Sequence, residues 1–251
     1  SLDKKIIRRK QKKRLLSKSF SSTNPDSYEA GLEIGEALLE IKPEAIIIFT
    51  SYHYDLEDMM EGLYSGLDNR ECILFGGSGD GFYESANAAH HGVCALGFNS
   101  NGKIRWNLAI RTGAKNRPEE KAEECAREVM ENLDNSVDMA FVFADLHCDG
   151  VKIARGAENV LNIPFIGGLT GDDWNFKEGF VFANGELYRE TVGILGMSGD
   201  FQFAIGTASG WKPLGEKGTV EDADGSTVRK ISGKTAFDFL EEQFGIPPAE
   251  A

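Results

Sequence analysis

The sequence predicts an α/β protein with tandem-duplicated α/β units on mixed sheets, related by a pseudo-twofold axis. Residues 49–55 match residues 143–149, with a phenylalanine, a histidine and an aspartate in register. Residues 74–80 match residues 165–172 in the same order, with one extra residue in the second stretch. Because ordered matches of this kind mark an internal repeat, we expect two copies of a ~95-residue unit. Helical periodicity followed by short apolar runs in each copy predicts the α/β class.

The first copy is assigned to residues 21–115, after a basic leader at residues 1–20. The leader concentrates lysine and arginine, so it is expected to be a solvated tether, with phosphate binding as the alternative. Asn24 is placed as the N-cap of a helix that Pro25 opens, and apolar residues recur at helical spacing as far as Ile41.

Each of these helices leads into a short apolar run that predicts a buried strand, at residues 45–49 and 139–143. Asp55 and Asp149 stand where a second helix of each copy needs its N-cap. A further short strand then ends at a double glycine in both copies. The elements up to this point therefore alternate as helix, strand, helix and strand.

Antiparallel strands are predicted after each double glycine. In the first copy, residues 93–98 and 104–110 flank an Asn-Gly pair, which is typical of a hairpin turn. The second copy, residues 116–210, repeats the pattern with another Asn-Gly hairpin and ends in a strand at residues 201–205. Each copy is thus expected to end in antiparallel strands, which make its sheet mixed.

Residues 211–251 fall outside the duplication. A turn-rich segment at residues 210–215 predicts a hinge. A hairpin around an Asp-Gly turn and a helix ended by Gly245 are expected to follow. We expect this region to be the opening of a further domain that is cut off.

Composition excludes several classes of protein. The chain of 251 residues is 41% hydrophobic and 27% charged, an ordinary globular mixture. Its longest apolar run is far shorter than a membrane span, and no signal-peptide pattern is present. The net charge of −13 disfavours nucleic acid and anionic membranes as partners. No two of the four cysteines have the spacing of a metal site or a redox motif, which favours free thiols in a reducing cytoplasm. The cysteines are Cys72, Cys94, Cys125 and Cys148.

The double-glycine segments are the leading candidate for a binding site. Residues 76–81 fail the spacing of a dinucleotide fingerprint, a Walker loop and a nucleophile elbow. One interpretation is a tight turn, or close packing, that only glycine permits. The other is a nest of N–H groups for an anion beside aspartates for an ammonium group, which would suit an amino acid, although such aspartates also cap turns. The candidate ligand-binding residues are Gly76, Gly77, Ser78, Asp80, Gly167, Gly168, Thr170, Gly171, Asp172, Asp173, His53 and His147.

Two histidines, His53 and His147, occupy equivalent positions at predicted strand ends. Each is either satisfied by a backbone partner or faces a ligand or metal. Because no complete catalytic motif is found, we expect no catalytic residues and no enzyme. The alternative is a hydrolase-like enzyme in which Ser78 or Cys148 attacks and one of these histidines is the base. The sequence itself requires no metal or cofactor.

Residues 165–173, 179–188 and 210–215 together resemble the N-terminal half of the FIST family, a sensory module of intracellular signal-transduction proteins. The resemblance implies a cytoplasmic domain that binds a small-molecule ligand, an amino acid or a derivative. It also implies a signalling output partner, such as a histidine kinase, a cyclic-nucleotide enzyme or a chemotaxis component. A haem-binding gas sensor is a further alternative, and haem is implied by the resemblance alone. The family pattern continues into a C-terminal region that this chain only begins.

Overall fold

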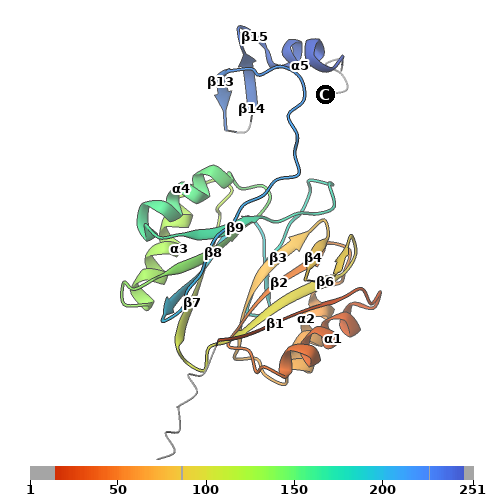
Figure 1. Cartoon of the computed structure of the whole chain (residues 1–251), viewed down its shortest axis with the longest axis vertical. Helices are drawn as coiled ribbons and strands as arrows, with labels where there is room; N and C mark the ends of the chain where they lie inside the picture. Colours follow the sequence, from red (N-terminus) through yellow and green to blue (C-terminus); the bar gives the residue numbers. More distant parts are fainter. Residues whose placement is uncertain (1–14, 86, 226, 246–251) are drawn as a thin grey trace, which may run out of the picture. The chain divides into compact units, whose positions relative to one another are not determined.

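The computed structural model describes residues 15–85, 87–225 and 227–245. The chain divides into unit 1 (Ser1–Phe203), which holds both copies of the repeat, and unit 2 (Ala204–Ala251) (Figure 1). Most of the predicted leader lies outside the described residues. Its assigned end at residue 20 is too late, because a strand that pairs along its whole length already begins at Leu16.

The two copies contain the same elements in the same order. The first copy consists of β1 (Leu16–Ser22), α1 (Ser27–Leu39), β2 (Ala45–Ser51), α2 (Leu56–Leu67), β3 (Ile73–Gly79), β4 (Phe82–Glu84), β5 (Asn87–Ala89) and β6 (Val93–Asn99). The second consists of β7 (Ile104–Thr112), α3 (Pro118–Asn132), β8 (Met139–Ala144), α4 (Gly150–Leu161), β9 (Phe165–Leu169), β10 (Val181–Ala183), β11 (Glu186–Tyr188) and β12 (Thr191–Gly199).

The sheets confirm the α/β class and the tandem duplication. The strand order β1-β6-β2-β3 in the first copy is repeated as β7-β12-β8-β9 in the second. In both, one strand pair is parallel, β2 with β3 and β8 with β9, and the other pairs of these four strands are antiparallel. Each sheet is therefore mixed, as the sequence predicts.

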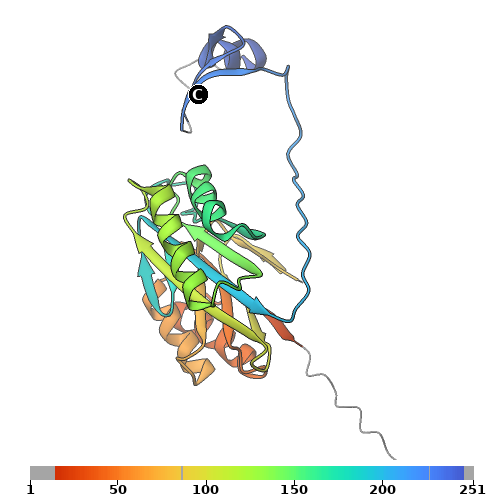
Figure 2. The ribbon, with the colours of Figure 1, turned by 90° about the vertical axis from the view of Figure 1, so that its left-hand side faces the viewer.

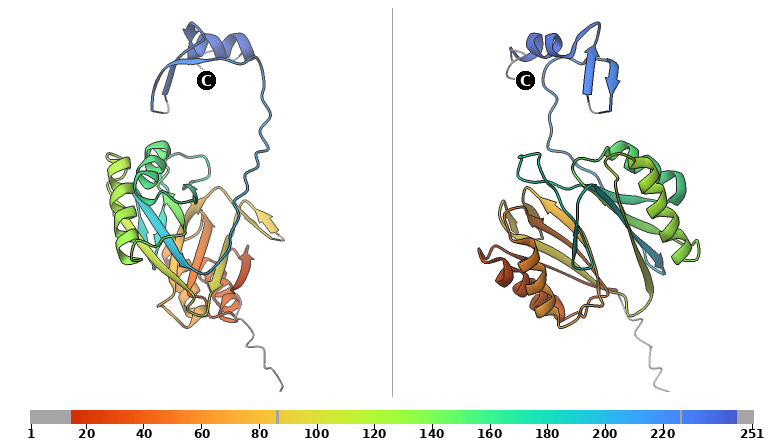
Figure 3. Two further views of the ribbon diagram at one scale, coloured as in Figure 1. Left: turned by 60° about the vertical axis from the view of Figure 1, so that its left-hand side comes forward. Right: turned by 180° about the vertical axis from the view of Figure 1, so that it is seen from behind.

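The two sheets pack face to face, with a pair of helices on the outer face of each (Figure 3). Side chains of β2 alternate between the layers: Ile46 and Ile48 pack under α1 and α2, whereas Ile47 faces the other sheet. The equivalent residues Phe49 and Phe143 meet between the sheets, with ring centroids 5.2 Å apart. Burial on both faces explains why these strands are continuous apolar runs.

The predicted hairpin at residues 93–110 is wrong, because β6 and β7 lie in different sheets. The turn between them does form, and it is held by Glu44, whose carboxylate accepts from the N–H groups of Ser100 and Gly102. This turn sends the chain from one copy into the next. The boundary between the copies therefore follows β6, earlier than the predicted boundary at residue 115.

Helix caps follow the prediction in two cases and differ in one. Asp55 and Asp149 cap α2 and α4, each accepting from two backbone N–H groups. The N-cap of α1 is Asp26 rather than Asn24. Asn24 instead accepts from the N–H of Asp26, which closes the turn that precedes the helix.

One hairpin crosses between the copies. The hairpin β10–β11 belongs to the second copy but pairs with β3 of the first, which makes that sheet six-stranded. The corresponding hairpin of the first copy, β4–β5, forms a two-stranded sheet of its own. The two hairpins therefore depart from the symmetry that the rest of the copies follow.

Unit 2 contains the predicted hairpin and helix: β13 (Val220–Asp224), β14 (Thr227–Ile231), β15 (Lys234–Thr235) and α5 (Ala236–Phe244), which Gly245 ends. Residues 201–205 form no strand, and after β12 the chain continues as an extended segment (Figure 2). Unit 2 begins at Ala204 rather than at the predicted residue 211. No helix in the described ranges is long and apolar enough to cross a membrane.

Candidate functional site

The double glycines lie inside strands β3 and β9, not in turns, and they do not have positive φ angles. Close packing explains why glycine is needed at the first position of each pair. A Cβ on Gly76 would lie 1.7 Å from the carbonyl oxygen of Ile48, and a Cβ on Gly167 would lie 1.7 Å from the carbonyl oxygen of Val142. The packing interpretation is thus correct at these two positions. The tight-turn interpretation is wrong.

The second glycines of the two pairs have different surroundings. A Cβ on Gly77 would lie 2.7 Å from the side chain of Thr170, whereas one on Gly168 would meet nothing within 4 Å. Because β3 is paired on both edges, Gly76 and Gly77 lie in a completed sheet and form no nest for an anion. The nest predicted at the first double glycine is therefore absent.

The segments that follow the two double glycines bind each other and join the copies. The hydroxyl of Ser78, which is 3% exposed, donates to Gly171 O (2.8 Å) and accepts from the N–H of Phe180 (2.9 Å). The N–H of Gly171 donates back to Ser78 O, and the N–H of Asp173 donates to Asp80 Oδ1 (2.7 Å). These predicted site residues come together, and their hydrogen bonds chiefly hold the two copies to each other.

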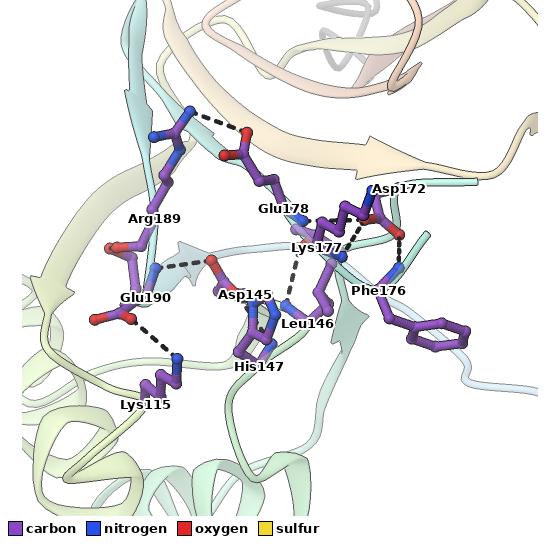
Figure 4. A network of polar contacts seen from close by, with 12 residues as sticks. Lys115, Asp145, Leu146, His147, Asp172, Phe176, Lys177, Glu178, Arg189 and Glu190 are labelled. Carbon is purple, nitrogen blue, oxygen red and sulfur yellow. Dashed lines mark hydrogen bonds and ion pairs between the residues drawn. The ribbon is translucent and has the colours of Figure 1, made fainter. Parts of the chain in front are cut away.

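Asp172 has a structural role (Figure 4). Its carboxylate is 2% exposed and accepts from the N–H groups of Phe176 (2.8 Å), Lys177 (2.6 Å) and Glu178 (3.0 Å). Burial raises the pKa of this carboxyl, but the three backbone bonds outweigh burial and hold the pKa below its ordinary value. Because the carboxylate is committed to its own loop, it is not available to an ammonium ligand.

The Asp172→Asn variant is expected to lose ~1–3 kcal/mol of unfolding free energy at neutral pH, because an amide cannot accept three N–H bonds in this way. The folded-state pKa of Asp172 is depressed, so its stabilising charge is present at neutral pH and is lost as the pH falls below about 4. The difference between the two proteins in urea unfolding should therefore shrink in acid. Asp200→Asn, at an exposed aspartate after β12, is the control and should show no such dependence on pH. A difference that is equal at neutral and acid pH would contradict the assignment.

The two equivalent histidines lie in separate carboxylate pairs. His53 Nε2 is 2.9 Å from Asp173 Oδ2, and its ring lies 4.5 Å from that of His91. His147 Nδ1 is 3.1 Å from Asp145 Oδ1. The two histidines therefore bind different carboxylates.

The sequence did not single out Asp145, a buried carboxylate at the end of β8. It accepts from the N–H of Glu190 (2.7 Å) and of His147 (2.8 Å) (Figure 4). The equivalent residue of the first copy, Ser51, accepts from the N–H of Gly92 (3.1 Å). The repeat alignment places a polar residue at the same strand end in both copies, and this is the signal that could have revealed the role of Asp145.

The hydrolase alternative finds no support in these contacts. The hydroxyl of Ser78 bonds to backbone groups on both sides and to neither histidine. Burial raises the pKa of the Cys148 thiol to about 12, so this sulfur is protonated and not nucleophilic at neutral pH. The described side chains thus form no nucleophile–base pair of the kind considered.

An open groove of about 380 Å³ lies beside Asp80. Asp80 Oδ1 is bonded to the loop of the second copy, and in the described part of the chain no cation pairs with this carboxylate. Trp174, which is 71% exposed, lies at the same groove. A carboxylate beside aromatic rings is suited to an ammonium group. The groove is lined by Asp80, Gly81, Phe82, Tyr83, Ala88, Ala89, His90 and Trp174.

A larger cleft of about 600 Å³ opens between the two sheet faces and is mostly apolar. Haem needs an axial ligand to its iron. No histidine or methionine is among the described lining residues, burial raises the pKa of the Cys94 thiol to about 11, and Tyr83 at the rim is almost fully exposed. The cleft therefore does not fit haem. Its apolar walls include Ile47, Phe49, Leu96, Phe141, Phe143 and Ile166.

Comparison with known proteins gives one family and two more distant likenesses. Residues 8–115 and residues 85–234 match the FIST N domain. An uncharacterized protein of Methanocaldococcus jannaschii is 27% identical over 237 residues, which cover 86% of this chain and 45% of that protein. The chain thus spans about half the length of that relative. A crystal structure of cyanuric acid hydrolase from A. caulinodans is similar over 75% of this chain and 69% of that one, with 11% identity and a TM-score of 0.40.

Proposed function

The chain belongs to the FIST N domain family, a family of sensory domains, and from this premise we propose that it senses a small molecule bearing an ammonium group. The groove beside Asp80 is the binding site in this proposal, and an amino acid or a derivative is the ligand class. Trp174 and Phe82 supply the aromatic walls. His90 lies at the same groove, where a ring N–H would donate to the carboxylate of an amino acid.

One observation carries the proposal: Asp80 presents an exposed carboxylate to an aromatic groove and has no cationic partner among the described residues. A charge-assisted hydrogen bond is stronger than a neutral one, and an aromatic face adds a cation–π attraction. The net charge of −13 raises the local concentration of cations around the chain. Both the local and the overall electrostatics therefore favour a cationic ligand group.

The larger apolar cleft is the weaker candidate for such a ligand. Its one carboxylate, Glu84, already accepts hydrogen bonds from Ser19 and Asn87. Burying a charged group without a matching partner costs several kcal/mol, and the cleft offers an ammonium group little compensation. An amino acid is better accommodated at Asp80.

The ligand site is linked to the second copy through the bond between Asp80 and Asp173, and from there to His53. Ligand occupancy at Asp80 is therefore placed to act on the loop that joins the copies. We propose that a signalling output protein or domain, such as a histidine kinase, cyclic-nucleotide enzyme or chemotaxis component, detects this change. The four cysteines are buried free thiols, which supports a reducing, cytoplasmic location.

A thermal-shift panel tests the proposal, because a ligand that binds the folded state raises its melting temperature. The panel contains the common amino acids, the amines formed from them by decarboxylation, and the N-acetylated form of each. We expect one or more ammonium compounds to raise the melting temperature and their uncharged acetylated forms to have no effect. Equal shifts from both forms, or no shift from any ammonium compound, would contradict the proposal.

A further inference from the structure

The crossing hairpin shows how this fold completes a sheet edge. In β10, Phe182 lies opposite Gly76 of β3, and its side chain is fully buried in the core cluster of α1 and α2. Gly76, which has no side chain, is thus the cross-strand partner of an aromatic residue. The first copy thus receives both a strand and an aromatic side chain from the second.

The equivalent edge of the second copy, on β9, is open. The N–H of Thr170 donates to Ala144 O, so the backbone N–H and C=O groups of every second residue of β9 face β8. The backbone groups of the other residues face away from β8, towards an edge that no strand of the described chain occupies. These residues are Phe165, Gly167 and Leu169. This edge carries no charged residue, and Leu169 is 47% exposed. An apolar, unpaired edge of this kind is a template for another strand.

A cavity of about 140 Å³ lies next to this open edge, between β9 and α4. It includes Ile153 and Ala154, at the positions that correspond to Met59 and Met60 beside Phe182 in the first copy. Gly167 corresponds to Gly76. The second copy therefore has both features of an acceptor, a free edge and a hole for a side chain.

The matching donor is the hairpin β4–β5. Its pairs Phe82 with Ala89, Tyr83 with Ala88 and Glu84 with Asn87 repeat those of β10–β11, which places Tyr83 at the position of Phe182. Tyr83 is 91% exposed, whereas Phe182 is fully buried. The hairpin projects from the body of unit 1 (Figures 2 and 3). The hairpin thus carries an aromatic side chain that is not packed in the core of its own chain.

We propose that β4–β5 of one molecule adds to β9 of a second copy of the chain. Tyr83 then enters the cavity beside α4 and lies opposite Gly167, as Phe182 lies opposite Gly76 within the chain. The interface inside unit 1 supplies the pattern. The donor hairpin, whose side chains Glu84 and Asn87 bond to Ser19 and Ser21 of β1, occurs on the same chain as the open edge of β9. Such a contact uses different surfaces on the two molecules, so it is heterologous.

Two variants separate the donor from the acceptor. Tyr83→Asp places a charge on the exposed donor side chain, and Ala154→Arg fills the acceptor cavity with a charged residue that suits a helix. Tyr28→Asp, at an exposed tyrosine on α1, is the matched control. Circular dichroism and the melting temperature show that each variant is folded, and light scattering coupled to gel filtration gives its mass.

We expect the unmodified chain and Tyr28→Asp to self-associate with rising concentration, and each of the other two variants alone to associate ~10-fold or more weakly. Mixing Tyr83→Asp with Ala154→Arg should restore association as a one-to-one pair, because one still has the acceptor and the other the donor. A monomeric unmodified chain at the highest concentration, or a mixture that stays monomeric, would overturn the proposal. Because Tyr83 also lines the groove beside Asp80, all of these measurements are made without added ligand.

Discussion

The Phe182→Ala variant should unfold with a free energy ~3–5 kcal/mol lower than that of the unmodified chain, the range for truncating a buried phenylalanine. Phe182 is fully buried, and it comes from the hairpin that the second copy contributes to the first. Its loss removes apolar contacts with α2 and leaves a cavity at the junction of the copies. Urea unfolding followed by circular dichroism measures the effect.

Tyr83→Ala is the matched control, since Tyr83 occupies the same position in the other hairpin. Because this side chain is 91% exposed, its truncation should change the free energy of unfolding by less than ~0.5 kcal/mol at concentrations where the chain is a monomer. Equal losses in the two variants would mean that the two hairpins are alike, which would contradict the described exchange of β10–β11.

Adding a methyl group to Gly76 or Gly167 should cost at least ~3 kcal/mol and can abolish folding. In each case the new Cβ would lie 1.7 Å from a carbonyl oxygen of the neighbouring parallel strand. Backbone atoms in a paired sheet cannot move away without breaking the ladder. Urea unfolding, or the yield of folded protein where the variant does not fold, measures the loss for Gly76→Ala and Gly167→Ala.

Gly168→Ala is the control for these variants, because its Cβ would have no neighbour within 4 Å. It should retain the fold and lose less than ~1 kcal/mol. A Gly167→Ala protein as stable as the Gly168→Ala protein would show that close packing is not the reason for the double glycine. The comparison therefore separates two adjacent glycines that sequence alone treats as one motif.

Much of the fold was predictable because its signals are local or repeated. Apolar runs located β2 and β8, and Asp55 and Asp149 were identified as helix caps from their place before each helix. The turn at Asn101 and Gly102 was found, but its local signal says nothing of which sheets its two strands join. The turn is also held by Glu44, a residue distant in the sequence whose carboxylate accepts from its N–H groups.

The candidate site was less predictable for the same reason. Ser78, Gly171 and Asp173 were predicted as ligand-binding residues, and the structure shows them in hydrogen bonds between the copies. These bonds join segments ~90 residues apart, which no local pattern reveals. Asp172 looked like Asp80 in sequence, and only the fold shows that its own loop uses the carboxylate. Trp174 directly follows these aspartates, and its place at the groove was not predicted.

The most direct test of the central claim is a calorimetric titration of the strongest ammonium compound from the thermal-shift panel into the unmodified, Asp80→Asn and Asp68→Asn proteins. A hydrogen bond between charged groups contributes ~1.5–3 kcal/mol, so Asp80→Asn should bind about 10- to 100-fold more weakly. Asp68→Asn, at an exposed aspartate after α2, should bind like the unmodified protein. Equal affinity for all three proteins would contradict the assignment of Asp80 as the residue that recognises the ligand.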